Sequence, residues 1–115
     1  MGMTIRYEQY GSAGVLALGG DLRGEQAAGD FRNAVGHALD AGAVKAIVVD
    51  FSGTRSVDSG GLEALIWSCG RLGGGARSVH LAGLDANCHK IFEITRLDDQ
   101  FDLYPDVQTA LKAIK

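Results

Sequence analysis

Apolar and polar positions alternate with a period of two at the start of the chain and with a helical period further on. In residues 4–10, Ile5 and Tyr7 alternate with polar neighbours, which predicts a strand with one solvent-facing side. The apolar run 15–18 predicts a second strand after the Gly-rich turn at 11–14. Because the connection is so short, the two strands are expected to form an antiparallel hairpin.

Beyond residue 20, helical and extended patterns alternate. Apolar residues at steps of three and four predict helices over 24–41, 61–72, 85–96 and 106–114. Short apolar runs predict strands over 44–51, 78–82 and, weakly, 101–104. Helix ends are expected at Gly42 and at the glycines 73–75. The expected buried faces of the second and third helices are Leu62, Leu65, Ile66, Cys69 and Leu72, and Cys88, Ile91, Phe92 and Thr95.

The predicted order is β-β-α-β-α-β-α-(β)-α, which is typical of the α/β class. Alternating strands and helices favour a mixed, mostly parallel sheet of four to five strands with about four helices packed on it. A chain of 115 residues is expected to form one domain spanning 1–115. In such folds, ligands and partners bind near the carboxyl ends of the strands.

Composition narrows the class of protein. Hydrophobic residues make up 46% of the chain and charged residues 22%, which indicates a globular rather than a disordered chain. The net charge of −3, without a basic stripe, argues against a nucleic-acid partner. No apolar run reaches the ~20 residues of a membrane span. Arg6 and Glu8 lie where a signal peptide would be apolar, so we expect the protein in the cytoplasm.

Neither cysteines nor histidines form a pattern that binds metal. Cys69 and Cys88 are expected to be reduced, buried thiols, because so short a chain needs more than one bridge for a disulfide framework. The histidines are scattered rather than spaced as ligands, so we expect no metal site and no cofactor. The acidic residues Asp98, Asp99, Asp102 and Asp106 are interpreted as solvated surface.

The main candidate site lies between the third predicted strand and the second predicted helix. Either Asp58 or Ser59 is a natural N-cap for that helix. A phosphate on Ser59 would face the positive end of the helix, beside the like charge of Asp58. Gly60 and Gly61 are expected to clear space for the close approach of another protein. The spacing alone also allows a serine that only caps the helix.

Four segments resemble the STAS domain, specifically the bacterial anti-sigma-factor antagonists. Residues 50–53 (Asp-Phe-Ser-Gly) and 57–62 (Val-Asp-Ser-Gly-Gly-Leu) resemble the family's strand end and its Asp-Ser-Ser/Thr-Gly-Leu motif. Residues 18–22 (Leu-Gly-Gly-Asp-Leu) look like its Gly-Glu-Leu-Asp segment, and residues 91–97 look like the end of its Phe-x-x-Thr/Ser-Gly-Leu helix. The predicted order of elements is also the family's order.

The resemblance implies a partner switch without catalysis of its own. In this family, a serine that aligns with Ser59 is phosphorylated by a cognate serine kinase that doubles as an anti-sigma factor. The unphosphorylated antagonist binds the kinase and frees the sigma factor, phosphorylation breaks the complex, and a metal-dependent serine phosphatase reverses the step. A monomer that forms heteromeric complexes is the expected state. The expected partner-binding loop contains Asp58, Gly60, Gly61, Asp21 and Arg23.

The chain departs from the family pattern at three positions. Gly60 replaces the family's second hydroxyl residue, which leaves Ser59 as the available acceptor. Arg23 stands where the family has an acid; if it faces the serine loop, it could pair with a phosphate there or mark a different partner surface. Arg96 stands where a capping glycine is usual, which concerns folding more than function.

The segment 58–61 (Asp-Ser-Gly-Gly) also allows one alternative function and suggests another that the fold excludes. The chain could be a constitutive STAS subunit of a larger assembly, a stress-signalling scaffold or the partner of a lipid-transport ATPase, with Ser59 only as a helix cap and contact residue. Asp-Ser-Gly-Gly is also found around the nucleophile of trypsin-like proteases, but a serine that introduces a helix in so short a chain excludes that fold. Trp67 is expected in the peripheral core or, if exposed, as an interface anchor.

Overall fold

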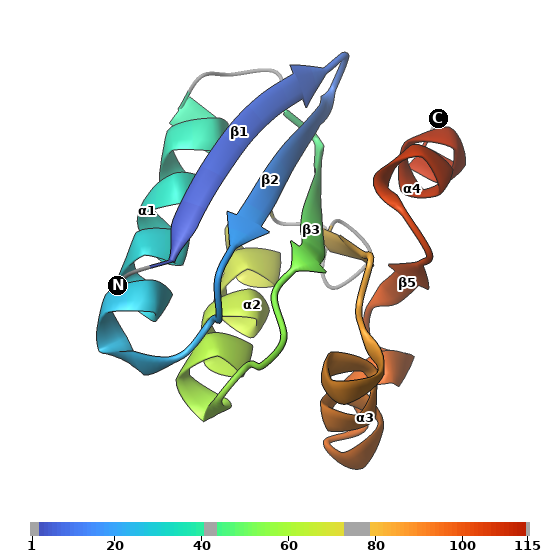
Figure 1. The fold of residues 1–115 in the computed structure, drawn as a ribbon. Helices are drawn as coiled ribbons and strands as arrows, with labels where there is room; N and C mark the ends of the chain where they lie inside the picture. The colour runs from blue at the N-terminus through green and yellow to red at the C-terminus, as the bar shows by residue number, and fades with distance from the viewer. Residues whose placement is uncertain (1–2, 41–43, 73–78, 115) are drawn as a thin grey trace.

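A five-stranded sheet with helices on both faces forms the molecule (Figure 1). The computed structural model describes residues 3–40, 44–72 and 79–114. The elements are β1 (Thr4–Tyr10), β2 (Ala13–Gly19), α1 (Gly24–Asp40), β3 (Ala46–Gly53), α2 (Ser59–Leu72), β4 (Val79–Ala82), α3 (Ala86–Ile94), the short 3-10 helix η2 (Leu97–Asp99), β5 (Asp102–Tyr104) and α4 (Val107–Ile114).

The strands lie side by side in the order β1-β2-β3-β4-β5. β1 pairs with β2 antiparallel, and the other neighbours pair in parallel. The predicted fold class is therefore confirmed, including the leading hairpin and the weak last strand. The predicted helix ends at Gly42 and at glycines 73–75 fall outside the described residues.

The larger core lies between the sheet and the helices α1, α2 and α3. Leu16, Ile47 and Leu81 of three neighbouring strands pack there with Phe31 of α1 and Leu65 of α2. On the opposite face, a smaller group forms under α4, made of Val15, Val48, Ala82 and Ala110. Since β3 is covered on both sides, its central positions must all be apolar, which explains the continuous run in the sequence.

Helix ends follow local capping chemistry. Asp85 accepts a hydrogen bond from the Cys88 backbone N–H at 2.8 Å, so it caps α3 and lies outside it. Asp106 accepts from the Thr109 N–H at 2.8 Å at the start of α4. Arg96 adopts a left-handed conformation with φ 62°, and this ends the helical stretch before the predicted residue 96.

Three expected burials are wrong. Tyr7 on β1 is 38% exposed, because its strand is at the edge of the sheet. Ile66 is 46% exposed, and Ala64 and Ser68 are buried instead. The helix α2 is therefore rotated about its axis relative to the prediction. The close packing of Gly61 against Leu22 and Val57 fixes the orientation of its first turn. Thr95 is exposed and bonds back to its own helix.

Two negative findings concern the described ranges. Across 3–40, 44–72 and 79–114, no helix is both long and apolar enough to cross a bilayer. The same part of the chain contains no group of three or more His, Cys, Asp or Glu side chains arranged to hold a metal ion.

Candidate functional site

Two loops lie side by side at the carboxyl ends of β2 and β3. Residues 20–23 connect β2 to α1, and residues 54–58 connect β3 to α2. The Leu22 N–H donates to the Ser56 carbonyl at 3.1 Å, and the Asp58 N–H donates to the Leu22 carbonyl at 3.2 Å. This ladder makes the two loops, called the site loops below, one hydrogen-bonded unit.

Asp21 joins the site loops through its side chain. Its Oδ1 accepts hydrogen bonds from the backbone N–H groups of Arg55 at 3.1 Å and Ser56 at 3.2 Å. These bonds, that from Arg55 first, hold the pKa of the Asp21 carboxyl below its usual value. The Thr54 hydroxyl, which is buried, donates to the Gly20 carbonyl at 2.8 Å. Asp21 therefore holds the site loops together while it remains exposed to solvent.

Asp58 is the N-cap of α2. Its Oδ1 accepts from the Gly61 N–H at 2.9 Å, three residues on, and its Oδ2 accepts from the N–H of Gly24, the first residue of α1, at 2.8 Å. The Gly24 bond, then the Gly61 bond, and further the positive charge of Arg23, lower the pKa of this carboxyl. The sequence allowed either Asp58 or Ser59 as the N-cap of α2. The hydrogen bond from the Gly61 N–H identifies Asp58 as the cap, and the interpretation of Ser59 as the cap is wrong.

Ser59 is the first residue of α2, and its side chain is exposed. Because Asp58 supplies the cap, the Ser59 hydroxyl is not needed to satisfy the end of the helix. A phosphate on this oxygen would lie at the positive end of the helix dipole and beside an ionised carboxylate. The Ser59 hydroxyl is therefore accessible and follows a helix cap that is fixed by two hydrogen bonds.

The two glycines after Ser59 have different roles. A Cβ on Gly60 would meet nothing nearer than a carboxylate oxygen of Asp58 at 3.5 Å, so this position is open as expected. A Cβ on Gly61 would lie 2.6 Å from the Leu22 carbonyl oxygen and 2.9 Å from Val57 Cγ1. The expectation that Gly61 clears space for a partner is therefore corrected: its space is filled by the core.

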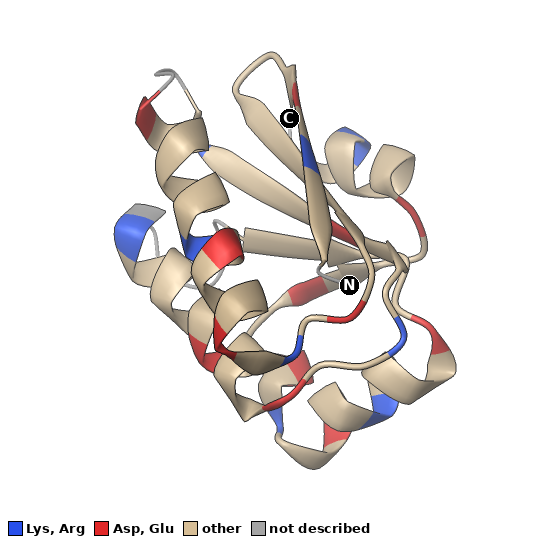
Figure 2. Cartoon of the chain, turned by 60° about the vertical axis from the view of Figure 1, so that its left-hand side comes forward, with Lys and Arg blue, Asp and Glu red and all other residues tan. Residues whose placement is uncertain are grey.

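Arg23 is exposed and belongs to the first of the site loops. Its charge lowers the pKa of both Asp21 and Asp58, which places it within electrostatic reach of the second loop. Each site loop contains one acidic and one basic residue, and Figure 2 shows red and blue segments close together in this part of the molecule. Through this charge, Arg23 acts on one carboxylate of each site loop.

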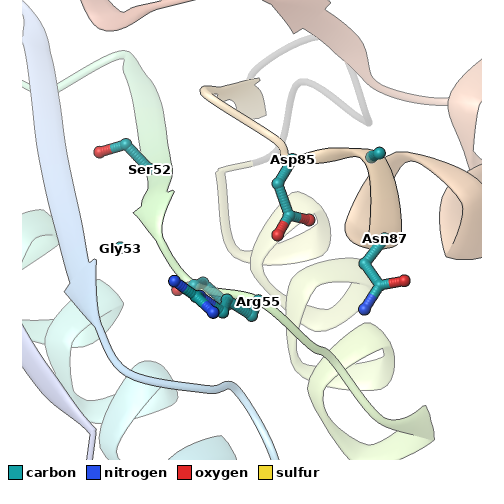
Figure 3. Close-up of a pocket in the computed structure, with 7 residues that line it drawn as sticks. Ser52, Gly53, Arg55, Asp85 and Asn87 are labelled. Atoms are coloured by element: carbon teal, nitrogen blue, oxygen red, sulfur yellow. The ribbon is translucent and has the colours of Figure 1, made fainter.

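A polar hollow of ≈ 720 Å³ lies on the other side of the second site loop. Figure 3 shows its lining, with Ser52 and Arg55 from the end of β3 and the loop, and Asp85 and Asn87 from the start of α3. Sequence reasoning did not include Arg55 or Asn87, because only the parallel pairing of β3 with β4 brings α3 to this edge. Thr54 and Arg55 of the second site loop line the hollow, whereas Asp58 and Ser59 do not.

The comparisons with known proteins assign the family. The family model described as "Mlab, STAS domain" matches residues 5–107, and the chain therefore belongs to the STAS domain family. No curated protein sequence matches it significantly.

Solved structures agree on the fold. An anti-sigma factor antagonist from Mycobacterium paratuberculosis superposes with a TM-score of 0.83 at 24% identity, covering 96% of this chain and 92% of its own. Unphosphorylated SpoIIAA gives 0.81 at 20% identity, covering 96% of each chain. The phosphorylated form of SpoIIAA, from Bacillus, gives 0.73 at 20% identity, covering 97% of this chain and all of its own.

Proposed function

We propose that this chain is a partner-switching regulator without catalysis of its own, an anti-sigma-factor antagonist. In its unphosphorylated form it binds a cognate anti-sigma serine kinase, phosphorylation of Ser59 releases it, and a serine phosphatase restores it. The observation that carries the proposal is the exposed Ser59 hydroxyl on the first residue of α2, beside an Asp58 whose two oxygens are already engaged. The serine can accept a phosphate without any loss of the helix cap.

The effect of the phosphate follows from charge. A phosphoserine adds about −1.5 to −2 charge at pH 7. Asp58 is held ionised by its hydrogen bonds and cannot move away without breaking the contact to Gly24. An interface formed around a neutral Ser59 would then have to bury two adjacent negative groups. An uncompensated buried charge is expected to cost several kcal/mol, enough to separate a micromolar complex.

Arg23 moderates this effect within the chain. Its guanidinium lies on the same hydrogen-bonded pair of loops and already acts on Asp58. A guanidinium pairs well with phosphate oxygens. Arg23→Ala is therefore expected to raise the affinity difference between the unphosphorylated and phosphorylated forms, measured by calorimetric titration of each form with the kinase.

The comparisons support the proposal at the level of the fold. The similar structures are described as anti-sigma factor antagonists, and SpoIIAA is described in both an unphosphorylated and a phosphorylated form. The kinase, the phosphatase and the modified residue of this chain are part of the proposal.

The decisive measurement is intact-mass analysis of the protein isolated from its own host at rest and under stress. We expect a species heavier by one phosphate, mapped to Ser59, whose occupancy changes between conditions. In binding assays with the cognate kinase, Ser59→Ala should bind as the wild type does, and Ser59→Asp should bind weakly. If the Asp and Ala variants bind equally well, the charge mechanism is wrong.

A second candidate is favoured by the description of the matching family model, which names Mlab beside the STAS domain. In this candidate the chain is a constitutive subunit of a larger assembly, and Ser59 only contacts a partner. A stable complex that is recovered from the host with Ser59 unmodified in every condition would favour it over the switch.

A further inference from the structure

The outer surface between α1 and α2 carries a groove that the serine site does not use. Its volume is ≈ 560 Å³, and its principal lining residues are Arg32, Gly36, His37 and Asp40 of α1 and Trp67 and Arg71 of α2. The two helices lie next to each other on one face of the sheet (Figure 1). Trp67 lies about 12 Å along the axis of α2 from Ser59, at a rise of about 1.5 Å per residue.

The α2 side of the groove presents an exposed aromatic ring. Trp67, the single tryptophan of the chain, lines the groove and is 38% exposed, whereas its exposed neighbour Ile66 does not line it. Large aromatic side chains contribute most of the binding energy in many protein interfaces. The Arg71 guanidinium lies 5.6 Å from the centroid of the Trp67 ring, a cation–π contact that orders both side chains.

The charge of the groove is opposite to that of the molecule. The chain as a whole has a net charge of −3. The described groove lining contains Arg32 and Arg71 together with His37, and one acidic side chain, Asp40. Guanidinium groups bind carboxylates with two parallel hydrogen bonds, which favours an acidic peptide. The net negative charge of the whole chain disfavours a single-stranded nucleic acid as the occupant.

Gly36 leaves the groove hollow. A Cβ built at this position of α1 would meet no atom within 4 Å, so neither packing nor backbone conformation requires glycine there. Glycine within a helix costs about 1 kcal/mol relative to alanine. The missing side chain leaves room for one from outside, in the same groove that Trp67 lines.

We propose that the α1–α2 groove docks an acidic segment of a partner protein, with an apolar side chain on Trp67 and carboxylates on Arg32 and Arg71. This docking surface is separate from Ser59, and its occupancy does not depend on the phosphorylation state of that serine. It gives the chain a second contact with a partner, at the other end of α2.

The test uses Trp67 as its own fluorescent reporter. The probe is a synthetic peptide of about twelve residues, about 18 Å long as a helix, that combines Glu with Leu in an amphipathic pattern. We expect the acidic peptide to shift the Trp67 emission to shorter wavelength in a saturable manner. A peptide with Lys in place of Glu and a short oligothymidine serve as the comparison ligands, each titrated in the same buffer.

Variants of the full chain locate the binding. The double reversal Arg32→Glu, Arg71→Glu should weaken the acidic peptide at least about tenfold and improve the Lys peptide. Gly36→Gln should fill the groove and weaken binding without loss of thermal stability. Gly29→Gln is the matched control, because Gly29 is also an unobstructed glycine within α1 but does not line the groove.

Each result decides the proposal. Binding of the acidic peptide that is lost in the groove variants and retained in Gly29→Gln and Ser59→Asp supports it. Equal response to both peptides, no response to the acidic peptide, or tighter binding of the oligothymidine overturns it. Because Ser59→Asp is expected to lose the kinase but keep the peptide, failure here is distinguishable from failure of the partner-switch proposal.

Discussion

At the scale of single residues, the two glycines after Ser59 make contrasting predictions. Gly61→Ala introduces a Cβ 2.6 Å from the Leu22 carbonyl oxygen, whereas the Cβ of Gly60→Ala meets only an Asp58 carboxylate oxygen at 3.5 Å, an ordinary van der Waals contact. We expect Gly61→Ala to lower the free energy of unfolding by about 1–3 kcal/mol through overpacking, and Gly60→Ala to leave it unchanged or higher. Urea denaturation of both variants measures this. A Gly61→Ala protein as stable as the wild type would contradict the contact.

Arg96 offers a prediction of the opposite sign. It adopts φ 62° with its side chain exposed, a conformation that glycine tolerates without a steric penalty. Arg96→Gly is expected to raise the free energy of unfolding by up to about 1 kcal/mol, since the left-handed region costs other residues about 1–2 kcal/mol. Arg96→Ala is the control, because it removes the charge and keeps the strain. If both variants change stability equally, charge rather than backbone conformation is responsible.

The residues of the site differ in how well the sequence predicts their surroundings. The position and exposure of Ser59 could be predicted, because the Asp-Ser pair precedes a helical period. The difference between the environments of Gly60 and Gly61 could not be predicted. Gly61 is crowded by Leu22, which is far away in the sequence but lies beside it in the fold. The sequence predicted that either Asp58 or Ser59 is the N-cap of α2. Only the hydrogen bond that Asp58 accepts from the Gly61 N–H distinguishes the two.

At the scale of elements, the pairing of β4 with the edge strand β5 encloses a buried histidine of β4. His80 is 8% exposed, its Nδ1 lies 3.5 Å from an Asp102 carboxylate oxygen, and its ring contacts Tyr104 at 5.9 Å between centroids. Burial lowers the pKa of His80, and the negative charge of Asp102 opposes this only in part. The neutral form is therefore the one that the fold favours.

This predicts a loss of stability in mild acid. With its pKa lower in the folded than in the unfolded state, His80 contributes stability that is complete above about pH 6.5 and lost as the pH falls through the folded-state pKa. The free energy of unfolding should therefore fall as the pH is lowered below about 6.5. His80→Gln, which cannot titrate, should show a smaller fall. An equal pH dependence in the variant would assign the effect to other groups.

The elements themselves were predictable to different degrees. Helices and strands with a long apolar period, such as α1 and β3, were placed nearly at their observed bounds. The rotation of α2 was not, because the predicted face included Ile66, whereas tight packing of Gly61 turns Ala64 inward. An apolar residue next to the buried stripe looks the same in the sequence whether it belongs to the core or to the surface.

At the scale of the whole molecule, the two faces of the sheet are unequal. The α1, α2 and α3 side contains most of the buried apolar residues, while α4 is held by Ala110 and a few half-buried neighbours. We therefore expect α4 to open locally before the sheet unfolds. Hydrogen exchange followed by mass spectrometry should show amides of β2 and β3 exchanging only through global unfolding, and those of α4 exchanging faster. Equal protection of α4 and β3 would show a single cooperative unit.

The hydrogen-bonded pair of site loops has a consequence for kinetics. Two carboxylates and a ladder of backbone hydrogen bonds hold the segment before Ser59 in place, so in the proposed switch a phosphate is expected to act through its added negative charge rather than through a rearrangement of the loops. In the proposed switch, no slow refolding step would separate modification from response. The response time would be set by the turnover of the kinase and the phosphatase and by the dissociation rate of the partner. The chain itself would show no hysteresis.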